Sequence, residues 1–334
     1  MSENLPEQPV SRISVAPMMD WTDRHCRYFF RLLSPDARLY TEMIVDQALL
    51  HGNPDRLLAY DPSEHPVALQ LGGHDPGRLA AAAEMASGYG YDELNLNIGC
   101  PSDRVQSGRF GACLMAEPQR VADCVAAMAT NAAAPVSVKA RIGIDDHDDY
   151  GFLTTFIQTV ARGGCRHFIL HARKAILAGL SPRENRSIPP LKYATVYRLK
   201  QDFPELTIVL NGGIGSVSEV REHLEHVDGV MIGRKACAEP YLLAELQAQV
   251  GRSASRTGWQ LPDRHDIVRQ MADYADRQLA GGVRLHHITR HMLGLFAGQP
   301  AARRWRRYLS EQGQRSGAGS EVLHDSLRIF DRAA

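Results

Sequence analysis

Long apolar runs are missing from the 334 residues of this chain. None approaches the roughly 20 apolar residues that a membrane-spanning helix needs. The polar opening MSENLPEQPVSRIS also lacks the apolar centre of a signal peptide. We therefore expect a soluble, cytoplasmic protein with no membrane contact.

Paired cysteines are lacking as well. The six cysteines are scattered along the chain, and none falls in a CxxC arrangement. The sequence therefore suggests neither a zinc site nor a disulfide framework. We expect reduced thiols, most of them small buried apolar side chains, and no bound metal.

A net charge is also absent, because 38 lysines and arginines balance 38 aspartates and glutamates. The distribution is uneven, however. Between Arg284 and Arg315 seven arginines and three histidines accompany a single acid, Glu311. This segment predicts a cationic surface suited to phosphate backbones, and the alternative is an ordinary solvated face of a helix.

Eight short runs rich in Val, Ile and Leu recur along the first three quarters of the chain, and stretches with helical spacing lie between them. Runs that do not alternate cleanly are typical of parallel strands covered on both faces. Eight such units over about 250 residues predict a TIM (β/α)8 barrel. The runs are 13–16, 39–43, 67–71, 93–97, 136–140, 167–170, 207–210 and 229–232, with helices at 76–87, 118–131, 151–161, 191–201, 217–225 and 241–250.

The first two units are the least regular, so a six-stranded doubly wound fold is the alternative; no GxGxxG follows any run to support it. We expect a flexible N-terminus at 1–10, the barrel at 11–251 and a small all-helical domain at 252–334 that begins with a polar linker. We also expect a monomer. Helices of the second domain are predicted at 263–279, 285–296, 301–312 and 320–332.

Polar residues just beyond the strands are candidate site residues, because barrel active sites lie at the carboxyl ends of the strands. Asn211-Gly212-Gly213 and Gly233-Arg234 follow the seventh and eighth runs. Glycine-rich turns there, with a helix N-terminus behind them, form the usual phosphate site of a barrel. The alternative is that the glycines only make tight turns.

Lys139 and His171 end neighbouring strands and place two donors in the barrel mouth. A lysine in such a crowded interior is costly unless it meets an anion or an electron-rich ring. Cys100 stands on the loop after the fourth strand. A thiol that is mostly protonated at pH 7 can act as a general acid or as a nucleophile, and the residues alone leave both roles open.

Segments spread over most of the chain resemble the tRNA-dihydrouridine synthases. The segment that contains Cys100 is distinctive for this family, and the stretch that begins at His171 resembles its A subfamily, as do the segments HHITRHMLGLF from His286 and RRWRRYLSE from Arg303. The other matching strings are APMMDWTDRHCRYFFR from Ala16, ALQLGG from Ala68, DELNLNIGCPSDRVQSGRFGACLM from Asp92, VKARIG from Val138, HARKAILAGLSPRENRSIPPL from His171, NGGI from Asn211 and MIGRKA from Met231.

This resemblance implies that FMN is bound in the barrel mouth and reduced by NADPH. Its ring and phosphate would use the strand-end positions already described, together with the loop after the first strand. The implied FMN-binding residues are Pro17, Met18 and Met19, then Gln70, Lys139 and His171 facing the isoalloxazine, and Asn211, Gly212, Gly213, Gly233 and Arg234 at the phosphate.

The same resemblance implies reduction of uridines 20 and 20a in the D-loop of tRNA to 5,6-dihydrouridine. Hydride would pass from flavin N5 to uracil C6, and Cys100 would supply the proton to C5. The base would have to leave the folded tRNA and enter the barrel mouth. The implied tRNA contacts are Asn97, Arg183, Arg186, Arg303 and Arg306.

Three other interpretations share some of these features. A small-molecule flavin oxidoreductase of the dihydroorotate dehydrogenase type would have the same phosphate turns but no need for the arginine-rich helices. A non-flavin lyase or isomerase could use Lys139 as a Schiff base. A tRNA-binding module without activity would tolerate the loss of both Cys100 and Lys139.

Overall fold

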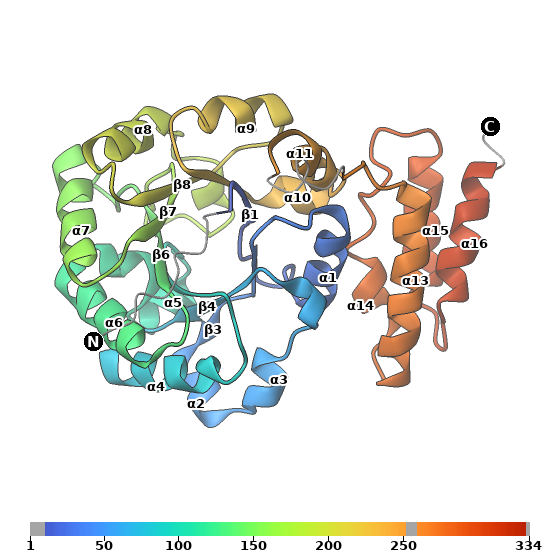
Figure 1. Cartoon of the computed structure of the whole chain (residues 1–334), viewed down its shortest axis with the longest axis horizontal. Helices are drawn as coiled ribbons and strands as arrows, with labels where there is room; N and C mark the ends of the chain where they lie inside the picture. The colour runs from blue at the N-terminus through green and yellow to red at the C-terminus, as the bar shows by residue number, and fades with distance from the viewer. Residues whose placement is uncertain (1–10, 252–258, 332–334) are drawn as a thin grey trace.

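The computed structural model describes residues 11–251 and 259–331. The flexible N-terminus predicted at 1–10 and the linker predicted at 252–258 therefore lie outside the described residues. Figure 1 shows a ring of strands enclosed by helices, with a separate group of C-terminal helices against one side.

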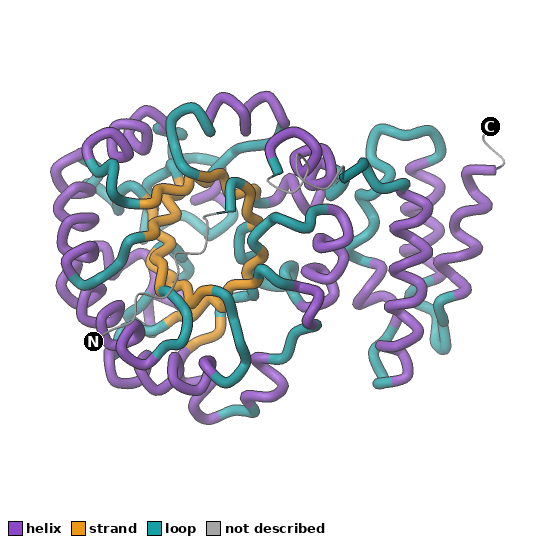
Figure 2. Tube along the Cα trace, in the orientation of Figure 1, coloured by secondary structure: helices purple, strands orange, loops and turns teal. Residues whose placement is uncertain are grey.

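The strands form the predicted parallel barrel, so the doubly wound alternative is wrong. The sheet runs in the order β1-β9-β8-β7-β6-β5-β4-β2 with every pairing parallel, and a bridge between Ser14 and Arg38 joins β1 to the β2 end. Figure 2 shows the strands as a ring seen end on. The strands are β1 Ile13–Val15, β2 Leu39–Tyr40, β3 Ile44–Val45, β4 Val67–Gly72, β5 Glu93–Ile98, β6 Val136–Arg141, β7 His167–His171, β8 Thr207–Asn211 and β9 Gly229–Ile232.

The second strand is shorter than the predicted run 39–43. It ends at Tyr40, and the chain then pairs again with β4 through a short extra strand, β3. The irregular sequence pattern of the first two units therefore corresponds to a short second strand followed by an extra one.

The two faces of the strands have different compositions. On β5 the apolar residues Leu94, Leu96 and Ile98 join the main core under the helices, while the alternate positions carry Glu93 and polar amides. Because successive strand side chains point to opposite faces, these polar groups lie inside the barrel. The interior has its own small apolar layer, which consists of Ala16, Tyr40, Ala68, Ile169, Val209 and Met231.

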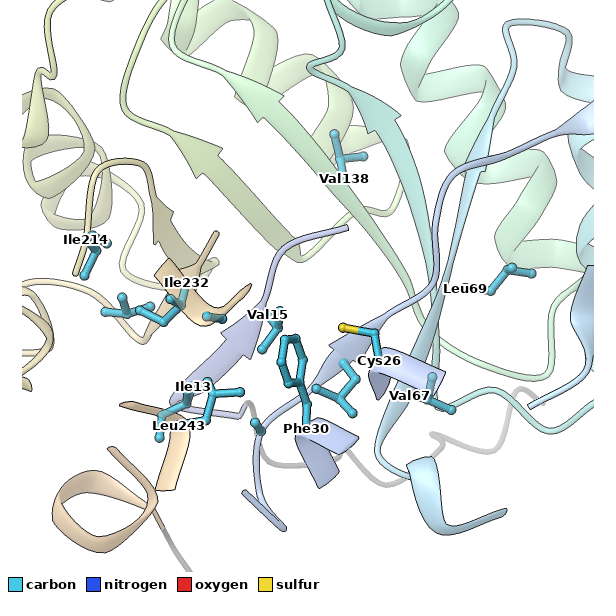
Figure 3. Close-up of a cluster of buried hydrophobic side chains, with 14 of the residues drawn as sticks. Ile13, Val15, Cys26, Phe30, Val67, Leu69, Val138, Ile214, Ile232 and Leu243 are labelled. Carbon is cyan, nitrogen blue, oxygen red and sulfur yellow. The ribbon is translucent and has the colours of Figure 1, made fainter. Parts of the chain in front are cut away.

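The helices cover the outside of the barrel and bury the larger core. Figure 3 shows Phe30 and Cys26 of α1 beside Val15 of β1. Pro76 and Pro118 occupy the first turns of α4 and α6, where the missing N–H is harmless, and both helices span the predicted residues. The barrel helices are α1 Arg24–Leu33, α2 Asp46–His51, α3 Pro54–Leu58, α4 Pro76–Ser87, α5 Asp103–Ser107, α6 Pro118–Asn131, α7 Tyr150–Arg162, α8 Tyr193–Asp202, α9 Val217–His223, α10 Arg234–Ala238 and α11 Leu242–Val250, with 3-10 turns η1 Pro62–Glu64, η2 Gly111–Ala116 and η3 Glu184–Arg186.

The C-terminal region is helical, as predicted, but one predicted helix is wrong. The helix predicted at 285–296 ends at Thr289 and gives way to turns, because Gly294 lies against the barrel backbone. A Cβ at Gly294 would fall 2.2 Å from the carbonyl oxygen of Ala238. The helices are α13 Arg264–Ala280, α14 Leu285–Thr289, α15 Ala302–Gln312 and α16 Glu321–Asp331.

The arginine-rich helix α15 is amphipathic. Trp305 is fully buried, donates its indole N–H to Ser326 Oγ at 3.0 Å, and meets Phe296 edge to face. It therefore packs within the helical region and not against the barrel. The opposite face of α15 exposes its four arginines, Arg303, Arg304, Arg306 and Arg307.

Side chains of α1 fix the helical region onto the barrel. Tyr274 stacks on Tyr28 with ring centroids 3.9 Å apart, and its hydroxyl lies 2.7 Å from His25 Nδ1. Asp23, the N-cap of α1, also pairs with Arg290 and His291 from the turn after α14. The two parts therefore share a polar and aromatic contact.

Two kinds of feature are absent from the described residues. None of the helices there is long and apolar enough to cross a membrane. Over the same residues, no cluster of three or more His, Cys, Asp or Glu side chains is arranged to hold a metal ion.

Candidate active site at the barrel mouth

A large cavity opens at the carboxyl ends of the strands. Its volume is about 2140 Å³, beyond the roughly 300–1,000 Å³ of a pocket for one drug-sized ligand. It extends from the barrel interior to the helical region, where its wall is formed by Gln278, Gly281, Gly282, Val283, Arg284, His286 and His287. A cavity of this size can hold a cofactor and part of a second, larger ligand together.

Most of the residues predicted from the sequence meet in this cavity. The exceptions are Arg183, Arg303 and Arg306, which do not line it. Those that line it are Pro17, Met18, Met19, Gln70, Asn97, Cys100, Lys139, His171, Arg186, Asn211, Gly212, Gly213, Gly233 and Arg234.

Cationic side chains gather on the wall formed by β6 to β9. Burial lowers the pKa of Lys139 to about 7, and the charge of Arg141 adds to this effect. Burial likewise lowers the pKa of His171 well below its usual value, with further contributions from Arg141 and Lys139. Within the described residues, none of Lys139, Arg141, His171, Arg186 and Arg234 forms an ion pair. This wall therefore favours an anionic ligand.

Lys139 and His171 also differ in their hydrogen bonds. The ammonium of Lys139 donates to Asn211 Oδ1 at 3.1 Å, and Asn211 in turn donates to the carbonyl of Met231. The buried Nδ1 of His171 has no hydrogen-bond partner in the described part of the chain. A buried polar atom without a partner is unusual in a folded protein, so this nitrogen is a further position where a ligand group fits.

The glycine turns have distinct conformations. Gly212 and Gly213 adopt φ values of +119° and +76°, which are accessible mainly to glycine. A Cβ on Gly213 would lie 2.5 Å from Leu191, so that turn is also sterically closed. Gly233 is different, because a Cβ there would meet no protein atom within 4 Å. Gly233 therefore borders open space at the N-terminus of α10, where backbone N–H groups can face a phosphate.

The loop that carries Cys100 is held by amide side chains from the strands. Asn97 Oδ1 accepts from the backbone N–H groups of Gly99 and Cys100, both at 3.0 Å. Its Nδ2 donates to Gln70 Oε1 at 2.8 Å. The half-buried thiol of Cys100 thus faces the cavity from a loop whose backbone is fixed.

Arg141 is a site residue to which the sequence analysis gave no role. It donates to the carbonyls of Gly99, Lys174 and Asn185, so it ties the Cys100 loop to the segment after β7. It also lines the cavity, and burial lowers its pKa to about 10. The signal was its place two residues beyond Lys139 on β6, which puts both side chains on the same face of the strand.

The predicted arginines divide into two groups. Arg186 lines the cavity, and Arg234 donates to its carbonyl at 3.2 Å. Arg183 is exposed beside it, and Arg303 and Arg306 are exposed on α15. The basic segment of the sequence therefore supplies the cavity wall through Arg284, His286 and His287, and supplies only outer surface through α15.

Fold and site together define a TIM-barrel enzyme with a cationic, glycine-lined mouth and a thiol beside it. Comparison with known families agrees with this class. The model of the dihydrouridine synthase family matches residues 14–331, so the chain belongs to the dihydrouridine synthase family.

Curated relatives resemble the chain over nearly its whole length. It is 58% identical over 317 residues to a tRNA-dihydrouridine(20/20a) synthase from Vibrio vulnificus, covering 95% of this chain and 96% of that protein. It is 57% identical over 319 residues to the protein of the same name from Escherichia coli strain K12, covering 95% and 91% respectively. A Salmonella typhi protein of that name is 57% identical over 324 residues, with 96% of both chains covered.

Proposed function

We propose that this protein reduces uridines 20 and 20a in the D-loop of tRNA to 5,6-dihydrouridine, with FMN as cofactor and NADPH as reductant. The cavity that joins the Cys100 loop to the basic edge of the helical region carries this proposal. The names of the relatives support the choice of substrate and positions.

The barrel mouth fits FMN on three counts. Open space at Gly233 and the helix behind it suit the phosphate, with Arg234 adjacent. Lys139 and the unpartnered nitrogen of His171 can donate to the polar edge of the ring. Pro17, Met18 and Met19, with Gln70, Asn211, Gly212 and Gly213, complete the proposed FMN set.

FMN, when bound in this cavity, would supply a hydride for uracil C6. Cys100 then donates its thiol proton to C5, a general-acid role that suits a thiol held on a fixed loop. Lys139 and His171, which line the cavity, would stabilise negative charge on a bound flavin by charge or hydrogen bonding. Asn97 lines the same cavity beside Cys100 and would contact the uracil base.

The substrate must reach the cavity as an unstacked base. Extrusion of a base from folded nucleic acid costs a few kcal/mol, and contacts to the backbone can offset that cost. We propose that Arg186 and the helical side of the cavity receive the extruded nucleotide. Arg183, Arg303 and Arg306, exposed outside the cavity, contact phosphates farther along the tRNA. We propose that residues 252–334 form this tRNA-binding domain.

A small-molecule flavin oxidoreductase is the alternative. It would need the flavin site but not a cavity wall supplied by Arg284, His286 and His287. The opening toward a second, basic region therefore favours a macromolecular anion as the substrate.

Mass spectrometry of nucleosides tests the proposal. tRNA that lacks dihydrouridine is incubated with the purified protein and NADPH, then digested and mapped. We expect uridine to gain the mass of two hydrogen atoms at positions 20 and 20a. A protein that binds flavin but leaves the tRNA unchanged would favour the small-molecule alternative.

A further inference from the structure

A chain of side-chain hydrogen bonds crosses the barrel interior from its base to the Cys100 loop. Each link is short and each residue is at most partly exposed. In order from the base, Ser137 Oγ donates to Glu93 Oε1 at 2.5 Å, Asn95 Nδ2 to Ser137 Oγ at 2.7 Å, Gln70 Nε2 to Asn95 Oδ1 at 2.7 Å, and Asn97 Nδ2 to Gln70 Oε1 at 2.8 Å.

The direction of these bonds is fixed at the base of the barrel. An ionised carboxylate can only accept hydrogen bonds. Burial would raise the pKa of Glu93, but His167 and Arg38, with the Ser137 hydroxyl, outweigh it and hold the pKa at about 2. Ser137 therefore uses its single proton on Glu93, and its oxygen can only accept from Asn95.

The same constraint passes along the amides. Asn95 turns its Nδ2 toward Ser137, so its Oδ1 is left to accept from Gln70. Gln70 then presents its Oε1 to Asn97, whose Oδ1 is left for the N–H groups of Gly99 and Cys100. A reversed chain would set the Asn97 amide hydrogens against those two backbone donors.

We propose that Glu93, Ser137 and Asn95 are positioning residues that hold the Cys100 loop in its reactive geometry through this relay. The charge on Glu93 sets the orientation of every amide between it and Asn97. None of the three lines the cavity, so they act only through Gln70 and Asn97. Their importance for the reaction rests on the proposed function, whereas their effect on the loop does not.

Two variants break the relay in different ways. Ser137→Ala removes the first hydroxyl but leaves the ion pair of Glu93 with Arg38 and its contact with His167, so it preserves the charged base of the barrel. Glu93→Gln keeps the size of the side chain and allows the chain to reverse. Tyr40→Phe is the matched control, because the Tyr40 hydroxyl donates to the same Oε1 of Glu93 at 2.7 Å but lies outside the relay.

Amide hydrogen exchange, followed by mass spectrometry of a peptide spanning 97–102, is the primary measurement and requires no substrate. We expect faster exchange of this peptide in Ser137→Ala, with the rest of the barrel unchanged, and wild-type exchange in Tyr40→Phe. In Glu93→Gln we expect faster exchange of the peptide together with lower stability of the barrel, because Arg38 loses its partner. Exchange at wild-type rate in a folded Ser137→Ala variant would overturn the proposal, even if Glu93→Gln did not fold. Equal acceleration in Tyr40→Phe would also overturn it.

Turnover of dihydrouridine-free tRNA is the second measurement. We expect kcat to fall about 10- to 100-fold in Ser137→Ala, the usual effect of losing an outer positioning group, with KM for tRNA unchanged. A change confined to KM would contradict a positioning role. If the wild-type protein forms no dihydrouridine, the proposed function fails, while the exchange experiment still decides the relay.

Discussion

The barrel interior has two polar layers that differ in whether their charged side chains are paired within the protein. At the base, Glu93 forms an ion pair with Arg38 and contacts His167 Nδ1, each at 3.2 Å. At the mouth, Lys139 and His171 lie among arginines, and no carboxylate in the described structure pairs with them. The charge of Glu93 is therefore balanced within the protein, whereas the mouth is complementary to an anion that comes from outside.

This difference predicts different effects of substitution at the two layers. A buried charge that keeps its partner is tolerated, and a buried charge without one destabilises the fold unless a ligand supplies the partner. Removing one partner of the ion pair between Glu93 and Arg38 at the base should therefore lower the stability of the barrel, and substitutions at the mouth should mainly reduce ligand binding or turnover.

Cys100→Ala gives the largest expected effect of the mouth residues. We expect dihydrouridine formation to fall by about 10²- to 10⁴-fold, the range for loss of a general acid. Reduction of the bound flavin by NADPH should proceed at the wild-type rate, because that step needs no proton from the thiol. Stopped-flow absorbance measures the flavin step, and nucleoside mass spectrometry measures the product. Loss of both steps would show that Cys100 supports the loop structurally.

Lys139→Met tests the unpaired charge of the mouth. We expect FMN affinity to fall about 10- to 100-fold, as for loss of a charged hydrogen bond of about 1.5–3 kcal/mol. The unfolding midpoint of the flavin-free protein should stay the same or rise, because a buried charge is removed. Fluorescence titration and thermal unfolding measure the two quantities. A large loss of stability would mean that Lys139 is part of the core.

The pH dependence sharpens this test. The pKa of Lys139 is lowered from 10.5 to about 7 in the folded chain. Between these values the unfolded state binds more protons, so the stability of the flavin-free protein should rise as pH increases from about 7 to 10.5, and Lys139 should add no pH dependence below about pH 7. Lys139→Met should flatten this slope. Arg38→Met at the base is the contrasting control. It removes one partner of a buried ion pair, so we expect the free energy of unfolding to fall by about 3 kcal/mol.

The sequence predicted the barrel well and its interior poorly. Apolar runs and helical spacing located the strands, and the strand-end rule placed Lys139, His171 and Cys100 in one cavity. The base layer was not predicted, because all eight runs, β5 among them, were interpreted together as strands that do not alternate cleanly. The alternating Glu93, Asn95 and Asn97 were the available signal, since a period of two places them on one face.

Other features could not come from local pattern. The helix predicted at 285–296 has good helical spacing, but it ends at Thr289 because Gly294 must approach Ala238 of the barrel. Likewise, the separation of Arg186 from Arg303 and Arg306 depends on how the helical region lies against the barrel mouth.

Gly233→Ala probes the phosphate end of the mouth. The added Cβ meets no protein atom within 4 Å, so we expect little change in unfolding midpoint. FMN affinity should fall about tenfold, the effect of weakening one backbone hydrogen bond to a charged group. Gly213→Ala is the contrasting variant, because its φ of +76° and the approach to Leu191 should lower stability as well. Unchanged FMN affinity in Gly233→Ala would show that the FMN phosphate does not bind beside Gly233.

The double variant Arg303→Ala and Arg306→Ala gives the smallest expected effect, because both side chains are exposed on α15 and outside the cavity. Turnover at low salt should fall only a few-fold. The plot of log affinity for tRNA against log salt concentration should become less steep, by about 1 for each phosphate that is no longer neutralised. Arg120→Ala is the control, since this exposed arginine lies on α6, across the barrel from the helical region in Figure 1. An unchanged slope in the double variant would mean that α15 is only a solvated helix face. The cationic surface for tRNA would then be limited to the cavity wall of Arg284, His286 and His287.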